Sequence, residues 1–323
     1  MEIIDIDQKY NVLITGVAGF IGSNLAEACL ESGFYVRGID NFYNGRRENI
    51  TELLKNEKFE FVEGDICDYK LCESICKDID FVFHEAAWGA VPKSIIQPLD
   101  YTKNNILGTH NILHSAYMNN VKGVIYASSA SVYGDNDDKV KIIGNEGNVL
   151  SPYALSKKAN EETALLYYNL YGLKTVGLRY FNVFGRKQNP YSEYSAVIPK
   201  FIKAILENKE IKINGDGEQS RDFTYIDNVI EANLKACMSI NNAAGQVFNV
   251  GFGESTSVNK LYNLISNLLR KETNVKYVPE RKGDIKNSLS DISKTKMVLE
   301  YNPKYSIQDG LEKTIEWYLK NLN

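Results

Sequence analysis

Residues 11–25 read Asn11-Val-Leu-Ile-Thr-Gly-Val-Ala-Gly-Phe-Ile-Gly-Ser-Asn-Leu25. The apolar run predicts a buried strand over Asn11–Thr15, and the residues after the glycines predict a helix over Phe20–Ser32. The glycines at positions 16, 19 and 22 permit a tight turn in which the backbone comes close to a pyrophosphate. The helix N-terminus adds free N–H groups and a positive dipole. The stretch therefore predicts a strand–turn–helix unit that binds a dinucleotide.

The same alternation of strands and helices continues through the first half of the chain. Further strands are expected at Tyr35–Ile39, Phe59–Val62, Asp80–His84, Val121–Ser128 and Leu173–Phe181, and helices at Tyr101–Asn119 and Pro152–Tyr171. Continuous apolar strands separated by helices are typical of a parallel sheet that is covered on both faces. We therefore expect an α/β fold, namely a Rossmann-type doubly wound parallel sheet.

The pattern changes after about residue 182, where loops lengthen and strands become scattered. We expect this part to form a smaller mixed α/β lobe for the substrate, ending in an amphipathic helix over Ile307–Leu319. A strand at Gln246–Val250 is expected to return to the main sheet. The expected division is residues 1–181 with about 226–251 for the dinucleotide, and residues 182–225 with 252–323 for the substrate.

Composition narrows the function classes. The formal net charge of −4 argues against nonspecific binding of nucleic acid, which needs a basic face. The longest weakly polar run, Phe81–Val91, is too short to span a bilayer, and the acidic start lacks the pattern of a secretory leader. We expect a cytoplasmic protein without a membrane partner.

The cysteines and histidines predict no metal site. Cys67, Cys72 and Cys76 lie close in sequence but lack the spacing of a metal motif, and His110 and His114 share a helix face without a third ligand. We expect reduced thiols.

Asp40 ends the second predicted strand. A carboxylate at this point binds both ribose hydroxyls of NAD and repels the 2′-phosphate of NADP, so NAD is the expected cofactor. Arg46 and Arg47 lie close enough to complicate this prediction, but Asp40 comes first after the strand. Asp65 and Ile66, which follow the third strand, are candidates for holding the adenine.

Tyr153 and Lys157 lie four residues apart, on one face of a predicted helix. A free phenol, with a pKa near ~10, is a poor base at neutral pH. A nearby ammonium favours the phenolate and lowers this pKa, and a hydroxyl such as that of Ser129 can share the proton. Beside a nicotinamide, the phenolate can take the proton of a carbinol while hydride leaves its carbon.

These residues resemble those of the extended short-chain dehydrogenase/reductase family, over essentially the whole chain. Within it the chain is similar to nucleotide-sugar 4-epimerases, especially those acting on UDP-N-acetylhexosamines. The resemblance is carried by the segments 15–25 (TGVAGFIGSNL), 84–94 (HEAAWGAVPKS), 128–134 (SSASVYG), 151–161 (SPYALSKKANE), 179–190 (RYFNVFGRKQNP), 213–228 (INGDGEQSRDFTYIDN) and 281–291 (RKGDIKNSLSD).

The resemblance implies roles for particular residues. The implied catalytic residues are Ser129, Tyr153 and Lys157. The implied NAD contacts, besides Tyr153 and Lys157, are Gly16, Gly19, Phe20, Ile21, Gly22, Asp40, Asn41, Asp65, Ile66, Ala86, Ala87, Asn105 and Tyr180. The implied UDP-sugar contacts, besides Ser129 and Tyr153, are Asn182, Ala196, Val197, Arg221, Arg281, Asp284 and Ser288.

Two departures from related enzymes favour 4-epimerisation of an acetylated UDP-hexose. Dehydratases of the family carry an acidic pair where this chain has Ala130 and Ser131, and the decarboxylases keep one Glu there. Without these groups, elimination lacks its proton relay. Epimerases confined to unacetylated hexoses place a bulky aromatic side chain at the position of Ser288, where a small residue leaves room for an N-acetyl group. UDP-Glc and UDP-Gal stay open as additional substrates.

Two other functions stay open. The first is 4-epimerisation of a UDP-hexuronic acid, acetylated or not, with Lys93 or Lys187 as the cation for the sugar carboxylate. The second is a catalytically silent NAD-binding regulator, although both Tyr153 and Lys157 are present. The resemblance further implies a homodimer that pairs the helices at about 101–119 and 152–171 into a four-helix bundle. Leu155, Leu166 and Leu170 would either contact the partner there or pack on the sheet.

Overall fold

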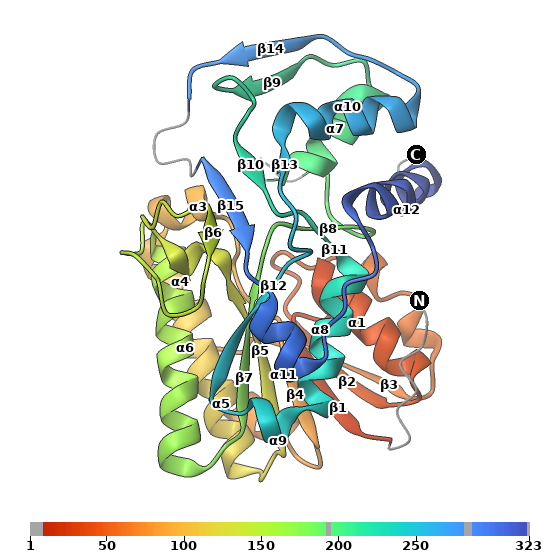
Figure 1. The fold of residues 1–323 in the computed structure, drawn as a ribbon. Helices are drawn as coiled ribbons and strands as arrows, with labels where there is room; N and C mark the ends of the chain where they lie inside the picture. The colour runs from red at the N-terminus through yellow and green to blue at the C-terminus, as the bar shows by residue number, and fades with distance from the viewer. Residues whose placement is uncertain (1–8, 192–194, 281–285, 322–323) are drawn as a thin grey trace.

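A computed structural model of the chain describes residues 9–191, 195–280 and 286–321. Its centre is a seven-stranded parallel sheet in the order β12-β7-β5-β4-β1-β2-β3 (Figure 1). The strands are β1 (Asn11–Thr15), β2 (Tyr35–Asp40), β3 (Phe59–Glu63), β4 (Phe81–His84), β5 (Gly123–Ser129), β7 (Thr175–Tyr180) and β12 (Gln246–Val250). The prediction of a doubly wound parallel sheet is confirmed, and β12 returns to this sheet beside β7.

Helices cover both faces of the sheet because successive residues of each strand point to opposite sides. Val12 and Ile14 of β1 join one apolar core, while Leu13 joins the other. The first core contains residues of α1 (Phe20–Glu31) and α8 (Ile226–Met238), and the second contains residues of α2 (Tyr69–Ile75), α5 (Gly108–Met118) and α6 (Pro152–Tyr171). The continuous apolar strands of the sequence are therefore buried on both sides.

The helix expected over Tyr101–Asn119 is less regular than predicted. It begins as α4 (Pro98–Tyr101), continues as a π-helical stretch over Thr102–Leu107 and ends as α5. The wide turns contain Asn105, whose side chain binds two neighbouring segments. Insertions of this kind are common at functional sites because they redirect a side chain.

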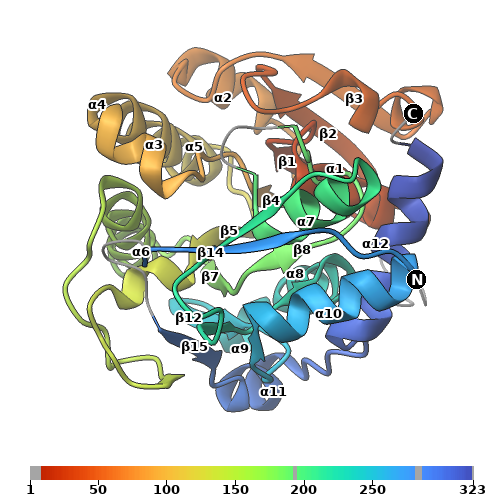
Figure 2. The same cartoon turned by 90° about the horizontal axis from the view of Figure 1, so that it is seen from above.

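Most of the remaining elements form a smaller mixed α/β lobe (Figure 2), whereas the helices Ile240–Ala243 and Ser293–Leu299 pack beside β7 and β12 of the central sheet. A four-stranded sheet has the order β13-β10-β15-β6, and two ribbons pair β8 with β11 and β9 with β14. These strands are β6 (Val140–Lys141), β8 (Val183–Phe184), β9 (Ile211–Asn214), β10 (Ser220–Arg221), β11 (Thr224–Tyr225), β13 (Thr256–Ser257), β14 (Val275–Val278) and β15 (Asn287–Ser290). The helices outside the two covering layers are α3 (Val91–Ile96), α7 (Val197–Leu206), α9 (Ile240–Ala243), α10 (Val258–Leu269), α11 (Ser293–Leu299) and α12 (Ile307–Asn321).

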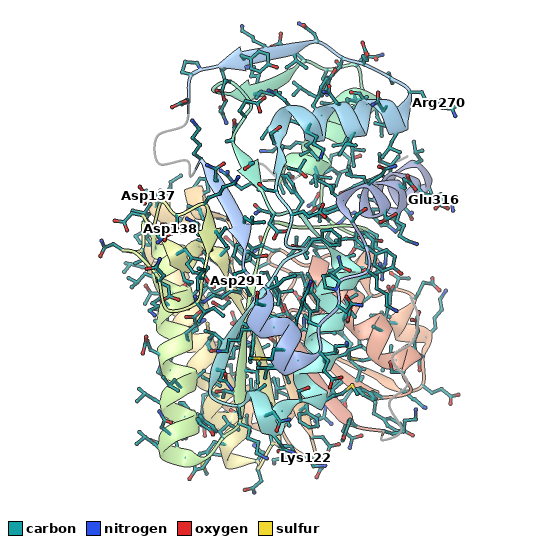
Figure 3. The ribbon with its side chains drawn as sticks, in the orientation of Figure 1. Lys122, Asp137, Asp138, Arg270, Asp291 and Glu316 are labelled. Atoms are coloured by element: carbon teal, nitrogen blue, oxygen red, sulfur yellow. The ribbon has the colours of Figure 1, made fainter. Side chains whose placement is uncertain are left out.

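The lobe lies beyond the carboxyl ends of the central strands. The amino ends are marked by Lys122, which precedes β5 and pairs with Asp80 at 2.7 Å. In Figure 3 Lys122 lies at the end of the molecule opposite to the lobe. In open α/β sheets ligands bind outside the carboxyl ends of the strands, so this edge is where the site is sought. Within the described part of the chain, no helix has the length and apolarity that crossing a bilayer requires.

Candidate active site at the carboxyl edge of the sheet

The glycine turn between β1 and α1 has no room for side chains. Gly16 has φ +69°, and a Cβ there would lie 2.9 Å from the backbone of Ala86. A Cβ on Gly22 would lie 2.2 Å from the Gly16 carbonyl oxygen, and one on Gly19 3.0 Å from the same oxygen. Phe20 and Ile21 then begin α1. The turn therefore brings bare backbone to the N-terminus of a helix, as binding of a pyrophosphate requires.

Asp40 lies beside this turn, at the end of β2. Its carboxylate is buried and accepts hydrogen bonds from the backbone N–H of Ala18 at 3.0 Å and of Phe42 at 2.8 Å. Burial raises the pKa of Asp40, while these backbone donors oppose that effect. The backbone N–H groups of Asn41 and Gly19 also act on this carboxylate. The group therefore shapes the turn at the point where the sequence analysis expects the ribose hydroxyls.

Asn41 and Asp65 come together although they follow different strands. Asn41 donates from Nδ2 to the Asp65 carboxylate at 3.3 Å, and both side chains are exposed. Ile66 next to them is buried against Gly108. This arrangement gathers the residues that the sequence assigns to the adenosine end of NAD.

The loop after β4 is held by hydrogen bonds with Thr15 of β1 and with Asn105 of the π-helical stretch. Thr15 Oγ1 accepts from the Ala86 N–H at 3.1 Å and lies 2.8 Å from His84 Nδ1. Asn105 accepts from the Trp88 N–H at 2.9 Å and donates to its carbonyl at 3.1 Å and to Ser156 Oγ at 3.0 Å. Asn105 thus positions the loop that contains Ala86 and Ala87, and a direct contact with NAD stays a prediction.

Ser129 and Tyr153 form a pair at the end of β5. Ser129 is the last residue of β5, and Tyr153 lies in the first turn of α6, where Ser151 caps the helix by accepting from the Ala154 N–H. A hydrogen bond with the Ser129 side chain lowers the pKa of Tyr153, although burial has the larger, opposite effect. The two groups are placed to share a proton.

Lys157 is buried below Tyr153 on α6 and is held by a backbone carbonyl. Its Nζ donates to the Ala127 carbonyl oxygen at 2.7 Å, and burial raises the pKa of Tyr153 above its usual value. Burial also lowers the pKa of Lys157 to about 8, against the opposing charges of Glu85 and Glu161. Burial of Tyr153 outweighs its hydrogen bond with Ser129 in the protein chain by itself. A lowered phenol pKa through Lys157 together with the positive charge of an oxidised nicotinamide stays a prediction.

Glu85 is a residue that the sequence reasoning missed. One of its oxygens accepts from the Tyr180 hydroxyl at 2.8 Å, and its other oxygen is buried without a hydrogen-bond partner among the residues that the structure describes. Asn233 completes this group by donating to the Tyr180 hydroxyl at 2.9 Å. Burial raises the pKa of Glu85 to about 7, and the charge of Lys157 opposes the rise. An acidic residue directly after a buried apolar strand was the signal for it.

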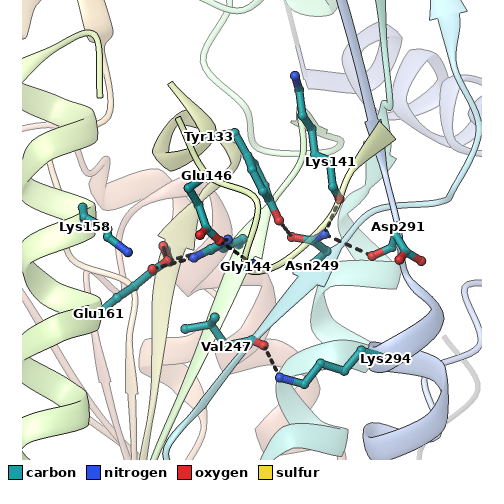
Figure 4. Close-up of polar contacts among 12 residues, drawn as sticks. Tyr133, Lys141, Gly144, Glu146, Lys158, Glu161, Val247, Asn249, Asp291 and Lys294 are labelled. Atoms are coloured by element: carbon teal, nitrogen blue, oxygen red, sulfur yellow. Dashed lines mark hydrogen bonds and ion pairs between the residues drawn. The ribbon is translucent and has the colours of Figure 1, made fainter. Parts of the chain in front are cut away.

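Glu161 and Glu146 take part in one buried ion-pair network (Figure 4). Arg179 of β7 makes two hydrogen bonds of 2.8 Å to the Glu161 carboxylate of α6 and a further ion pair with Glu146. Ser128 donates to Glu161 at 2.5 Å. Because a buried charge needs such partners, the network ties α6, β7 and the end of β5 together.

The lobe brings three of the expected substrate residues together. Arg221 of β10 lies opposite Ser288 of β15 in the parallel register, and Asn182 donates to the carbonyl of Asp222 at 3.3 Å. Ser288 is buried. Ala196 precedes α7, which begins with Val197. Arg281 and Asp284 lie outside the described residues.

Comparison with known proteins agrees with this geometry. The family model of the NAD dependent epimerase/dehydratase family matches residues 12–251. The chain belongs to this family. The match runs from β1 through β12 and so includes the glycine turn, the Ser129–Tyr153 pair and the complete parallel sheet.

Individual relatives narrow the activity to UDP-sugar epimerases. A putative UDP-glucose 4-epimerase of Methanocaldococcus jannaschii is 37% identical over 97% of this chain and 99% of its own length. The structure of UDP-N-acetylglucosamine 4-epimerase from Methanobrevibacter ruminantium M1, in complex with UDP-N-acetylmuramic acid, is 39% identical with a TM-score of 0.92, over 97% of this chain and 99% of that one. The UDP-glucuronic acid 4-epimerase of Bacillus cereus, solved with UDP-glucuronic acid and NAD, is 34% identical with a TM-score of 0.89, over 97% and 100%.

The expected cofactor and the recognised family are confirmed by these comparisons. NAD fits the residues that are present, because the glycine turn brings bare backbone to the N-terminus of α1 and because the Asp40 carboxylate lies beside it. The names of these relatives specify different UDP-sugars, so the comparisons do not identify which UDP-sugar this chain uses.

Proposed function

We propose that this protein is an NAD-dependent 4-epimerase that interconverts UDP-GlcNAc and UDP-GalNAc, and also accepts UDP-Glc and UDP-Gal. The observation that carries the proposal is the Ser129–Tyr153 pair, placed at the carboxyl edge of a sheet whose first turn is built for a dinucleotide. The small, buried Ser288 beside Arg221 supports an acetylated sugar. A tightly held cofactor belongs to the same proposal, because an enzyme that released it halfway would leave an oxidised sugar.

The chain's own residues supply binding and proton transfer. Bound NAD supplies reversible acceptance of the C4 hydride. Tyr153 takes the proton of the 4-hydroxyl, Ser129 orients that hydroxyl and relays its proton, and Lys157 holds the ribose next to the nicotinamide. The 4-keto sugar rotates so that its opposite face meets the nicotinamide, while Arg221 and Asn182 hold the diphosphate in place. Once the sugar presents its opposite face, Tyr153 would return its proton to O4.

The structure weakens the case for a UDP-hexuronic acid. Lys187 pairs with Glu27 at 2.5 Å and donates to the Asn49 carbonyl at 3.1 Å, on the side of α1. Lys93 donates to the Tyr43 hydroxyl at 2.6 Å. Both lysines that the sequence offered for the sugar carboxylate are thus engaged elsewhere.

The test is substrate selection by one purified preparation. UDP-GlcNAc, UDP-Glc, UDP-GlcA and UDP-GlcNAcA are incubated separately, and each sugar is resolved from its C4 epimer. We expect turnover of the first two and little of the uronic acids. Preferred turnover of a uronic acid would reverse the substrate assignment, and no turnover of any sugar, with NAD bound, would favour the silent regulator.

Ser288→Tyr tests the acetyl pocket within the same assay. A bulky ring in place of the small buried hydroxyl should lower kcat/KM for UDP-GlcNAc by roughly 10–200-fold, the usual range for steric discrimination in a pocket. UDP-Glc serves as the internal control and should lose much less. An equal loss for both sugars would place Ser288 away from the acetyl group.

We also propose a homodimer in which α5 and α6 of each protomer meet those of the other. Leu155, Leu166 and Leu170 of α6 are 53%, 55% and 67% exposed. The alternative that they pack on the sheet is thereby wrong, since the sheet-facing side of α6 is made by other residues such as Ala164.

A further inference from the structure

An aromatic stack joins the two loops on either side of the glycine turn. β1 lies between β2 and β4, so the loops that follow β2 and β4 flank the turn that follows β1. Tyr43 belongs to the loop after β2 and Trp88 to the loop after β4. Their ring centroids are 4.0 Å apart and their planes differ by 5°. The rings are in face-to-face contact, so nothing fits between them.

Lys93 of α3 contacts both rings of the stack. Its Nζ donates to the Tyr43 hydroxyl at 2.6 Å and lies 4.6 Å from the centroid of the Tyr43 ring and 5.3 Å from that of Trp88. An ammonium in this position is attracted by the faces of both rings. One cation therefore holds together residues from three segments.

The two halves of the stack are anchored unequally. Trp88 is fixed through its backbone by Asn105 and through its ring by Tyr101, which it meets edge-on at 5.6 Å. The Tyr101 ring meets that of Tyr153 edge-on at 6.4 Å. Tyr43, by contrast, is 45% exposed. Tyr43 is thus the half that can swing away, while Trp88 is part of the framework around Tyr153.

We infer that Tyr43, Trp88 and Lys93 form a clasp that retains the dinucleotide, and that Tyr43 must separate from Trp88 before NAD enters or leaves. A ligand that lies along the glycine turn passes between the two loops that the stack connects. The inference rests on the NAD-binding part of the proposed function and is independent of which sugar is epimerised. It gives a physical cause for retention of the cofactor through a reaction that returns the hydride it removes.

The test is the rate at which bound NAD leaves the protein. Wild type, Tyr43→Ala, Tyr43→Phe and Tyr35→Ala are saturated with radiolabelled NAD, chased with excess unlabelled NAD, and sampled for bound label over time. We expect Tyr43→Ala to release NAD about tenfold faster, the factor that corresponds to losing an aromatic pair. Tyr43→Phe keeps the stack and should release it more slowly than Tyr43→Ala.

Tyr35→Ala is the matched control. Tyr35 is also an exposed tyrosine with a lysine, Lys58, over its ring at 5.4 Å, but it lies at the amino end of β2. It should release NAD at the wild-type rate. Thermal unfolding of each variant checks that the fold is kept, which we expect because Tyr43 lies in an exposed loop.

A double variant tests that the rings act as one unit. Tyr43→Ala combined with Trp88→Leu should release NAD no faster than the faster single variant. Release from Tyr43→Ala at the wild-type rate, or independent addition of the two effects, would overturn the clasp. If wild type retains no labelled NAD, the assignment of NAD as the cofactor is overturned as well. This outcome differs from failure of the clasp alone, because wild type and all variants would then lack bound label from the first sample.

Discussion

Tyr153 depends on its surroundings for the chemistry proposed here. Burial alone makes its phenol a weaker acid, and the Ser129 hydroxyl is the neighbour that counteracts this. Tyr153→Phe removes the group that exchanges the proton with O4. We expect turnover to fall by roughly 10²–10⁴-fold, the usual contribution of a positioned acid–base group, measured as the initial rate with UDP-GlcNAc.

Tyr168→Phe is the control for this substitution. Tyr168 lies on the same helix, is exposed, and has no place in the site. Its variant should keep the wild-type rate. Wild-type turnover by Tyr153→Phe would assign the proton acceptor to another residue.

Glu85 should set the alkaline limit of activity through Lys157. Burial lowers the pKa of Lys157 to about 8, and Glu85 is the main charge that raises it, with Glu161 second. His84, which also faces Lys157, is neutral because burial lowers its pKa to about 3. In Glu85→Gln the opposing charge is lost, so the pKa of Lys157 falls further. The alkaline limb of kcat/KM should move to lower pH.

A pH profile of kcat/KM for wild type, Glu85→Gln and Glu162→Gln measures this shift. Glu162 is an exposed partner of Lys158 on α6 and should leave the profile unchanged. A limb that stays in place or moves to higher pH in Glu85→Gln would show that the carboxylate does not support the ammonium.

At the scale of elements, the turn between β1 and α1 is defined by backbone contacts. A Cβ at position 22 would lie 2.2 Å from the Gly16 carbonyl oxygen and 2.8 Å from its carbon, and backbone at this distance cannot yield without moving the helix. Gly22→Ala should therefore weaken NAD binding at least about tenfold by displacing the helix N-terminus, measured by equilibrium dialysis. Gly89→Ala, where a Cβ meets nothing within 4 Å, is the control. Equal affinity of both variants would mean that the turn adapts.

This turn was also the element that the sequence predicted best. The strand Asn11–Thr15 agrees residue for residue, and the helix ends one residue earlier than expected, because both depend on local apolar pattern and glycine positions. The four-stranded sheet of the lobe was not predicted. Its β10 contains only Ser220 and Arg221, and its partner strand is distant in sequence, so no periodicity marks either one.

Among the polar side chains of the site too, contacts within local motifs could be predicted and contacts between distant segments could not. The proximity of Ser129 and Tyr153 could be expected from the sequence because each belongs to a local motif. The charge of Arg179 inside a buried strand is explained only by Glu161 and Glu146, which come from α6 and a loop. The stack of Tyr43 on Trp88 likewise joins two loops that the sheet order brings together. Such pairs follow from topology rather than from sequence spacing.

At the scale of the whole molecule, α6 has Tyr153, the proposed catalytic base, in its first turn and exposed apolar side chains on its outer face. Leu166 and Leu170 lie one helical turn apart on this face, and Tyr171 next to them packs on Tyr117 of α5 at 4.9 Å between ring centroids. Two helices that expose apolar side chains side by side gain free energy by covering them, about 1.5–3 kcal/mol for each leucine fully buried.

Replacing both leucines by glutamate should therefore break the proposed dimer. Each protomer loses two apolar contacts and gains two charges that the partner's identical face cannot pair. The dissociation constant should rise at least about 100-fold, measured by sedimentation velocity over a range of concentrations. Leu319→Glu is the control, because Leu319 is equally exposed but lies on α12. If the double variant stays a dimer, the subunits meet through a surface other than the outer face of α6. Dimer formation would then have no direct effect on the helix that contains Tyr153.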